Sequence, residues 1–303
     1  MAEEMGKRAG VIGLGAMGLG MASSLARAGF EVLGFDPAPT AQARAKEAGI
    51  APKESPEAVF AGAEFIVLSL PTAAHVEAAV AAAQGAGLLA PDAARKVVID
   101  TSTSEAEVSR KLAGELAGAG HGFLDAPVSG GPSGAAAGQL SVMLGGDEAW
   151  VSRAMPALEA MATKILHVGP SGAGNVAKLV NNMLVASHMV TTLEALRLAE
   201  AAGVSAEDAL RVINAATGRS AISEIHYPNW VLPRSFDSGF STGLMRKDVR
   251  LARELAERSG CAMPVADLVA ELWAEENSGL KDADDFMHMG DPRVDRLSKK
   301  EKM

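Results

Sequence analysis

The sequence contains one cysteine, few aromatic residues and no long uninterrupted apolar run. A single thiol, that of Cys261, cannot form a disulfide within the chain, which favours a reducing compartment. Aromatic residues are only 4% of the 303 positions, whereas alanine and glycine are frequent, a composition that suits closely packed helices rather than an all-β sandwich. Gly, Gln or Lys interrupts each apolar stretch before the roughly 18 residues that a membrane span needs.

Positive charge is also in deficit, because 28 Lys and Arg stand against 37 Asp and Glu, a net charge of -9. This balance argues against nucleic acid or an acidic membrane as the main partner. The first ten residues, MAEEMGKRAG, are polar and lack the apolar run of a secretory signal. His, Cys and acidic residues nowhere cluster at metal-ligand spacing. We therefore expect a cytoplasmic protein that binds no metal.

Short apolar segments alternate with helical patterns in the first half of the chain. The predicted strands are AGVIGLG (9–15), EVLGFD (31–36), FIVLSLP (65–71), KVVID (96–100), GFLDAPV (122–128), LSVMLGG (140–146) and KILHVG (164–169). The predicted helices cover 16–29, 40–48, 73–83 and 104–119. Ser104 and Glu107 form a capping-box pattern at the start of the last one. The alternation predicts βαβ units and a parallel sheet, with a mixed part where the later strands come closer together.

The pattern changes at Pro170, beyond which no convincing strand is found. Residues 175–202 contain almost no helix breaker and have apolar side chains on several faces, which predicts a long helix buried between domains or subunits. Further helical patterns cover 205–216, 244–259 and 264–277. We expect an α/β Rossmann-like domain at 1–169, followed by an all-α domain at 170–303 for substrate binding and oligomerisation.

Three glycines, Gly13, Gly15 and Gly18, form a G-x-G-x-x-G pattern between the first strand and the first helix. In a Rossmann domain such glycines allow a tight turn, a close approach of a pyrophosphate and close helix–strand packing. Asp36 ends the second strand, where a carboxylate can bind ribose hydroxyls and would repel a 2′-phosphate. The pattern thus predicts NAD as the cofactor. The expected contacts in the turn are Gly13, Leu14, Gly15, Ala16, Met17 and Gly18.

Four motifs resemble those of the 3-hydroxyisobutyrate dehydrogenase family, the short β-hydroxyacid dehydrogenases, which include tartronate semialdehyde reductase and L-threonate dehydrogenase. They are VIGLGAMGLGMASSL (11–25), DAPVSGG (125–131), GAGNVAKLVNN (172–182) and FSTGLMRKDVRLA (240–252). They occur in family order and span nearly the whole chain. The resemblance implies an NAD-dependent dehydrogenase of a small β-hydroxy acid or the matching semialdehyde, assembled as a homodimer or homotetramer.

Lys178 is the candidate base for the hydroxyl proton. Its helical neighbours are mostly apolar, although spacing alone leaves open a lysine that extends to the surface. Burial would lower the pKa of its amine and allow it to exchange a proton. Asn182 lies four residues further on, on the same helix face, where an amide can orient the substrate hydroxyl. The resemblance assigns these roles to this lysine and this asparagine.

Other candidate residues follow from turns and from the family motifs. Ser129, Gly130 and Gly131 form a turn whose backbone N–H groups and hydroxyl suit a carboxylate. By resemblance, Lys247 reaches cofactor and substrate, Asp248 supports the site and Phe240 packs nearby. The remaining candidates are Leu70, Pro71 and Thr103 at the carboxyl edge of the sheet, on the nicotinamide side, and Arg219, which matches an arginine of some relatives and could contact an acidic substrate.

Three alternative functions compete with this one. A decarboxylase resembling 6-phosphogluconate dehydrogenase would carry a glutamate seven residues after the lysine, where this chain has Val185. A non-catalytic dehydrogenase fold used as a binding module, or an imine reductase, would usually lose the lysine, which is retained here. We therefore expect hydride transfer without decarboxylation. The sequence leaves the particular hydroxy acid open.

Overall fold

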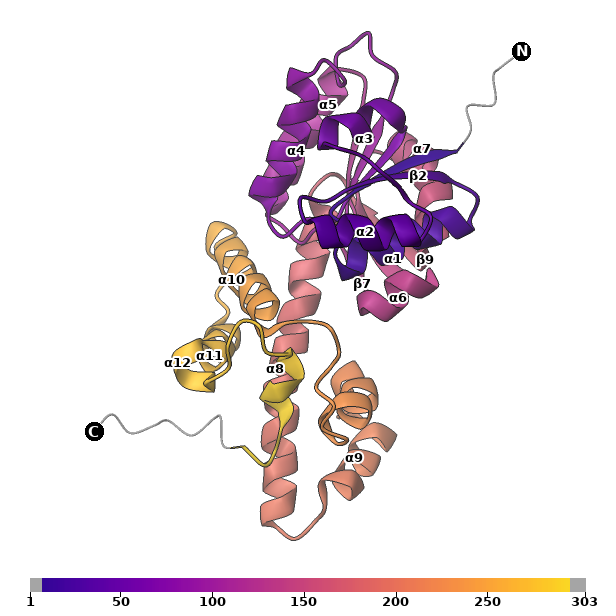
Figure 1. Cartoon of the computed structure of the whole chain (residues 1–303). Helices are drawn as coiled ribbons and strands as arrows, with labels where there is room; N and C mark the ends of the chain where they lie inside the picture. Colours follow the sequence, from indigo (N-terminus) through magenta and orange to yellow (C-terminus); the bar gives the residue numbers. More distant parts are fainter. Residues whose placement is uncertain (1–6, 295–303) are drawn as a thin grey trace. The chain divides into compact units, whose positions relative to one another are not determined.

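The computed structural model describes residues 7–294, and the first half of these residues forms a sheet with helices on both faces (Figure 1). The strands are β1 (Arg8–Ile12), β2 (Glu31–Phe35), β3 (Ala51–Pro52), β4 (Phe65–Leu68), β5 (Val97–Asp100), β6 (Gly122–Asp125), β7 (Val128–Ser129), β8 (Leu140–Gly145) and β9 (Ala162–Gly169). They lie in the order β3-β2-β1-β4-β5-β6-β8-β7, with β9 paired to β8. Strands β1 to β6 pair in parallel, whereas β8 runs antiparallel to β6 and β7. The expected parallel sheet with a mixed part is confirmed.

Both faces of this sheet are apolar, as a parallel sheet requires. Val11 belongs to one buried cluster and the next residue, Ile12, to the other, because successive side chains of a strand point to opposite faces. One cluster contains residues of α1 (Ala16–Arg27), α2 (Pro39–Glu47) and α7 (Glu148–Met161). The other contains residues of α3 (Pro56–Gly62), α4 (Ala73–Gly85) and α5 (Ala106–Gly118). A short helix, α6 (Gly131–Ala137), precedes β8.

The strand order reverses at β1, which lies between β2 and β4. In open α/β sheets, ligands bind beyond the carboxyl ends of the strands at such a reversal. The glycine turn after β1 lies at this position. The fold therefore places the predicted dinucleotide motif where a doubly wound sheet binds its cofactor.

A long helix, α8 (Ala173–Ala201), connects the two compact units of the chain, Met1–Lys178 and Leu179–Met303. The boundary between the units falls inside this helix, immediately after Lys178. The domain division expected at 169/170 stays a prediction about folding units. No helix among residues 7–294 is long and apolar enough to cross a membrane.

The second unit is helical in its described residues. After the later part of α8 it contains α9 (Ala206–Ala215), the π-helix η1 (Ile222–Val231), α10 (Thr242–Arg258), α11 (Pro264–Trp273), α12 (Glu275–Ser278) and the 3-10 helix η2 (Phe286–Gly290). Its buried cluster includes Met183 and Met189 of α8, Met245 of α10 and Trp273 of α11. The all-α character expected of this part of the chain is confirmed.

The structure departs from the sequence analysis in several local features. The expected capping box is wrong, because α5 begins at Ala106 and its N-cap, Glu105, makes no side-chain cap hydrogen bond. Ser104 instead accepts a hydrogen bond from the Asn175 side chain, as described below. The helix expected at 264–277 is interrupted at Ala274, whose ψ of 147° is not helical. The π-helix η1 forms at Ile222–Val231, where no helix was predicted. The elements β3, α3, α6 and α7 were not anticipated; β3 has two residues, α6 is rich in glycine and alanine, and α7 contains Pro156.

Candidate active site

The glycine turn after β1 combines two tightly packed glycines with one that faces open space. Gly13 has a φ of +91°, and a Cβ there would lie 2.2 Å from the carbonyl oxygen of Ser69. A Cβ on Gly18 would lie 1.8 Å from the oxygen of Gly13. By contrast, a Cβ on Gly15 would meet nothing within 4 Å. The first and third glycines allow the turn to pack, whereas Gly15 leaves the backbone accessible, as a pyrophosphate requires.

The start of α1 is also suited to an anion. Its N-cap, Gly15, makes no side-chain cap hydrogen bond, so no side chain of the cap competes for the first N–H groups. The N-terminus of a helix favours negative charge. Leu14, Ala16 and Met17 occupy the turn and the first helical residues beside it.

Asp36, directly after β2, is bound to the glycine turn. Its Oδ2 accepts the N–H of Leu14 at 2.7 Å and its Oδ1 accepts the N–H of Ala38 at 2.8 Å. These contacts hold a carboxylate beside the turn, at the distance along the chain where a dinucleotide ribose is bound. The residues present therefore fit a dinucleotide, and the carboxylate favours NAD over a 2′-phosphorylated cofactor.

Two loops at the carboxyl edge of the sheet are joined to each other. The N–H of Leu70 donates to the Ser102 hydroxyl at 3.0 Å, and the Thr101 hydroxyl donates to the Leu68 carbonyl at 2.7 Å. Leu70 and Thr103 are half-buried, and Pro71 is exposed. Because Gly13 packs on Ser69, these loops lie next to the glycine turn. Ser102, which links them, was not identified from the sequence.

Ser129, Gly130 and Gly131 connect β7 to α6. Ser129 pairs with Ser141 of β8, Gly130 is the N-cap of α6, and Gly131 begins that helix. The two glycines have φ values of +129° and +63°, which other residues rarely adopt. Backbone N–H groups in a turn can face one side, an arrangement that suits a carboxylate.

A buried network fixes the start of α8, and it was not identified from the sequence. The fully buried carboxylate of Asp125 accepts the N–H of Gly172 at 2.7 Å and that of Asn175 at 3.0 Å. Burial raises the pKa of Asp125, and these backbone hydrogen bonds oppose that shift. The Asn175 side-chain amide donates to the hydroxyls of Ser104 at 3.4 Å and Ser109 at 2.8 Å. Asp125 lies in the motif DAPVSGG and Asn175 in GAGNVAKLVNN, so membership in these motifs was the one sequence signal that pointed to them.

Lys178 lies one turn further along α8, and Asn182 one turn beyond it. Lys178 is 7% exposed and Asn182 is 5% exposed, so the lysine does not extend to the surface. Residues four apart on a helix share a face. The helix thus carries a buried amine and a buried amide on the same side.

The second unit brings Asn182, Asp248 and Lys247 together. Nδ2 of Asn182 donates to Oδ2 of Asp248 at 2.5 Å, and Nζ of Lys247 lies 3.3 Å from Oδ1 of Asp248. An ionised carboxylate only accepts hydrogen bonds, so Asp248 selects the nitrogen end of the Asn182 amide. The oxygen of that amide is then oriented away from Asp248. It accepts the Asn181 side-chain N–H at 3.1 Å, and Nδ2 carries a second N–H that can donate to a hydroxyl oxygen.

The other candidates of the second unit have different surroundings. Arg219 is exposed between α9 and η1. The ring of Phe240 packs edge-to-face on Phe286, with centroids 5.3 Å apart. Phe240 therefore anchors the segment before α10 by packing. No group of His, Cys and acidic residues within 7–294 could hold a metal ion.

An NAD-dependent oxidoreductase is the class that the sheet topology and the glycine turn define together. Two family models match the chain: the NAD-binding domain of 6-phosphogluconate dehydrogenase over residues 8–169, and the NAD-binding domain of NADP-dependent 3-hydroxyisobutyrate dehydrogenase over residues 172–291. Together they cover nearly all of the described residues.

Individual relatives narrow the class. A probable 3-hydroxyisobutyrate dehydrogenase of Mycobacterium tuberculosis is 40% identical, over 87% of this chain and 90% of the relative. An NAD-dependent L-serine dehydrogenase of Pseudomonas aeruginosa is 37% identical, over 88% and 91%. The solved structure of the M. tuberculosis 3-hydroxyisobutyrate dehydrogenase with L-serine superimposes with a TM-score of 0.84, at 37% identity, over 94% of this chain and 97% of that one. The chain belongs to the 3-hydroxyisobutyrate dehydrogenase family. It is an NAD-dependent oxidoreductase of β-hydroxy acids, as the sequence motifs predicted, and the decarboxylase alternative is not favoured.

Proposed function

We propose that this enzyme oxidises the β-hydroxyl group of a small hydroxy acid, with Lys178 as the base and Asn182 as the residue that orients the hydroxyl. The observation that carries this proposal is the hydrogen bond between Asn182 and the buried Asp248. It sets the direction of the amide on the helix face that also carries Lys178. Arg219, which is exposed, is the weakest candidate for a substrate contact.

The chemistry divides among the residues as follows. NAD, when bound, supplies the acceptor for a hydride from the carbon that carries the hydroxyl. One N–H of the Asn182 amide donates to Asp248, and its second N–H donates to the substrate hydroxyl oxygen, which leaves the single O–H proton for Lys178. Lys178 takes up the hydroxyl proton at Nζ, which requires the neutral amine. In the reverse direction the same amine returns the proton to the carbonyl oxygen.

The acid group of the substrate needs its own partners. We assign it to the backbone N–H groups and hydroxyl of Ser129, Gly130 and Gly131, together with the charge of Lys247. Positive φ values at both glycines support the first assignment. Nζ of Lys247 lies 3.3 Å from Oδ1 of Asp248. Because Asp248 also binds Asn182, its carboxylate holds the ammonium group of Lys247 near Asn182. The cofactor contacts that we propose are Gly13, Leu14, Gly15, Ala16, Met17, Gly18, Asp36, Leu70, Pro71, Thr103 and Lys247.

The relatives indicate which acids to test. Those named above are a 3-hydroxyisobutyrate dehydrogenase and an L-serine dehydrogenase. Both substrates combine a carboxylate with a β-hydroxyl group and differ at the carbon between them. We propose an acid of this shape. The test is an NADH-formation screen over 3-hydroxyisobutyrate, L-serine, L-threonate and tartronate semialdehyde (the last in the direction of NADH oxidation), with Lys178→Ala as the inactive reference. Turnover of none of them would contradict the proposal.

A homodimer or homotetramer of this chain, in the cytoplasm, is part of the proposal. Val180, Leu184 and Leu198 lie on one side of α8 and are 55%, 52% and 72% exposed. A second copy that covers them would remove this apolar surface from water. The exposed thiol of Cys261 suits a reducing compartment. Light scattering at micromolar concentration tests the assembly: a monomer contradicts it, and Leu184→Glu should dissociate it.

A further inference from the structure

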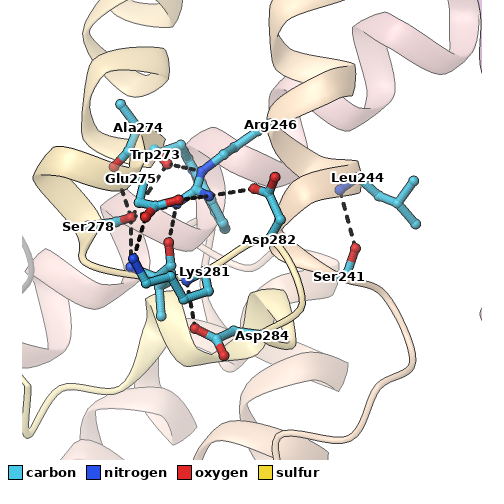
Figure 2. Close-up of polar contacts among 11 residues, drawn as sticks. Ser241, Leu244, Arg246, Trp273, Ala274, Glu275, Ser278, Lys281, Asp282 and Asp284 are labelled. Atoms are coloured by element: carbon cyan, nitrogen blue, oxygen red, sulfur yellow. Dashed lines mark hydrogen bonds and ion pairs between the residues drawn. The ribbon is translucent and has the colours of Figure 1, made fainter.

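Arg246 lies directly before the Lys247–Asp248 pair and binds a separate segment of the chain with its whole guanidinium group (Figure 2). Its Nε donates to the carbonyl of Trp273 at 2.7 Å, and its Nη1 donates to Oδ1 of Asp282 at 2.7 Å. Its Nη2 donates to the hydroxyl of Ser278 at 3.0 Å and to the carbonyl of Leu280 at 2.7 Å. All three nitrogens are therefore engaged by residues 273–282.

The same part of the chain also binds the first turn of α10. The N–H of Thr242 donates to the Asp284 carbonyl at 2.7 Å, and that of Gly243 donates to the Asp282 carbonyl at 3.0 Å. The first N–H groups of a helix have no partner within the helix, so these carbonyls satisfy donors that would otherwise need water. A Cβ on Gly243 would lie 2.8 Å from Cβ of Asp282, so the approach requires glycine.

This attachment determines how α10 is rotated about its axis. Arg246 and Asp248 are two residues apart and therefore point about 200° apart around the helix. One is held by residues 273–282, and the other is hydrogen-bonded to Asn182. A rotation of roughly 10° moves a side-chain end by about 1 Å at the outer radius of a helix, enough to disrupt a 2.5 Å hydrogen bond.

The planar fork of arginine suits this role. Arg246 is only 17% exposed at its side chain, and its bonds fan out to two backbone carbonyls, a hydroxyl and a carboxylate. A lysine has one nitrogen and could replace only part of this set. Arg250, one turn further on the same helix, provides a contrast: it is 59% exposed and pairs with Glu254.

We propose that Arg246 is a positioning residue of the dehydrogenase: by binding residues 273–282 it sets the rotation of α10, and hence the Asp248–Asn182 hydrogen bond that orients the substrate hydroxyl. This inference rests on the proposed role of Asn182. If Arg246 has this role, residues 273–284 affect the turnover rate, although they are far from the glycine turn in the sequence.

A double-mutant cycle tests the proposal. Arg246→Met should lower kcat/KM for the hydroxy acid about tenfold or more, because small displacements of positioning groups are costly, and should leave the KM for NAD near that of the wild type. In the Asp248→Asn background the same change should cost less than about twofold, because the path through Asp248 is already broken. The matched control Arg250→Met should stay within about twofold of the wild type. Equal losses in both backgrounds, or wild-type turnover in Arg246→Met, would overturn the proposal.

A second measurement needs no substrate. Hydrogen exchange of the amides of residues 242–248 should be faster in Arg246→Met than in Arg250→Met, because the first turn of α10 has lost an anchor. Unchanged exchange overturns the positioning role even if the wild type proves inactive on every hydroxy acid, a result that would count against the proposed function alone. If Arg246→Met fails to fold, Arg246→Lys replaces it, and an intermediate loss of kcat/KM is then expected.

Discussion

The side-chain amide of Asn182 donates a 2.5 Å hydrogen bond to the carboxylate of Asp248, which is 2% exposed. The two residues are 66 positions apart in the sequence, on α8 and α10. A carboxylate at this position allows only one direction of the amide, so it determines which atom of Asn182 is available to a hydroxyl group.

The first prediction concerns this pair. Asp248→Asn replaces an obligatory acceptor by a group that can donate or accept, so the Asn182 amide is no longer held in one direction. We expect kcat/KM for the hydroxy acid to fall by about tenfold to a hundredfold, with the melting temperature changed by only a few degrees. Steady-state kinetics and thermal melting measure both effects. Unchanged kcat/KM would remove Asp248 from the orienting group.

Lys178 carries the second prediction. Lys178→Ala should lower kcat by about 10² to 10⁴-fold, the usual contribution of a general acid–base group, and should leave NAD binding near that of the wild type. Quenching of protein fluorescence measures the binding. The control is Lys111→Ala, which removes an exposed lysine that pairs with Glu77 and should not affect turnover. A Lys178→Ala enzyme with wild-type kcat would contradict the assignment.

Asp36 should determine the preference between the two nicotinamide cofactors. The wild type should have a higher kcat/KM with NAD, because the carboxylate repels a 2′-phosphate. Asp36→Asn should narrow that preference, since the amide oxygen can still accept the Leu14 N–H while the charge is lost. Kinetics with both cofactors give the ratio. A higher kcat/KM with NADP than with NAD in the wild type would contradict the role assigned to Asp36.

The product should retain every carbon of the substrate. Loss of carbon dioxide from a β-keto acid is catalysed by an acid that protonates the enol, and Val185, two turns along α8 from Lys178, has no proton to donate. Trapped carbon dioxide should lag behind NADH, and the rate of its release per mole of accumulated keto product should not depend on enzyme concentration. Stoichiometric release that keeps pace with NADH would indicate a decarboxylase.

His226 should make the enzyme less stable in mild acid. Burial lowers the pKa of His226 to about 4, and Asp285 opposes that shift. Because an unfolded histidine titrates near 6.5, the unfolded state binds the extra proton, and stability falls as the pH drops from about 6.5 towards 4. The loss assigned to this residue between pH 7 and pH 5 is about 1–2 kcal/mol.

His226→Phe retains an aromatic ring against Trp230 and Phe286 and cannot be protonated. Urea unfolding of the variant should therefore lose less stability between pH 7 and pH 5 than that of the wild type. An equal loss in both proteins would place the acid sensitivity in other groups.

Local patterns in the sequence were sufficient for the α/β to all-α plan and for the dinucleotide turn. Gly13, Gly15 and Gly18 form a local spacing pattern, although the close neighbour of Gly13 is the distant Ser69. The strands and the long helix follow from hydrophobic periodicity. Lys178 and Asn182 share a helix face for the same reason, because their spacing is local. The capping box predicted at Ser104 is wrong, because the Ser104 hydroxyl binds the side-chain amide of Asn175, which is distant in the sequence.

Only the tertiary structure decided what holds these residues in place. Asp125 binds the start of α8 from 47 and 50 residues away, Asp248 orients Asn182, and Arg246 attaches α10 to residues 273–282. Hydrophobic periodicity does not predict such contacts. Each contact joins two segments that are distant in the sequence and that come together because the apolar faces around them are buried. The sequence by itself indicated which groups are candidates for the chemistry, and packing determined which way the side chains of those residues point.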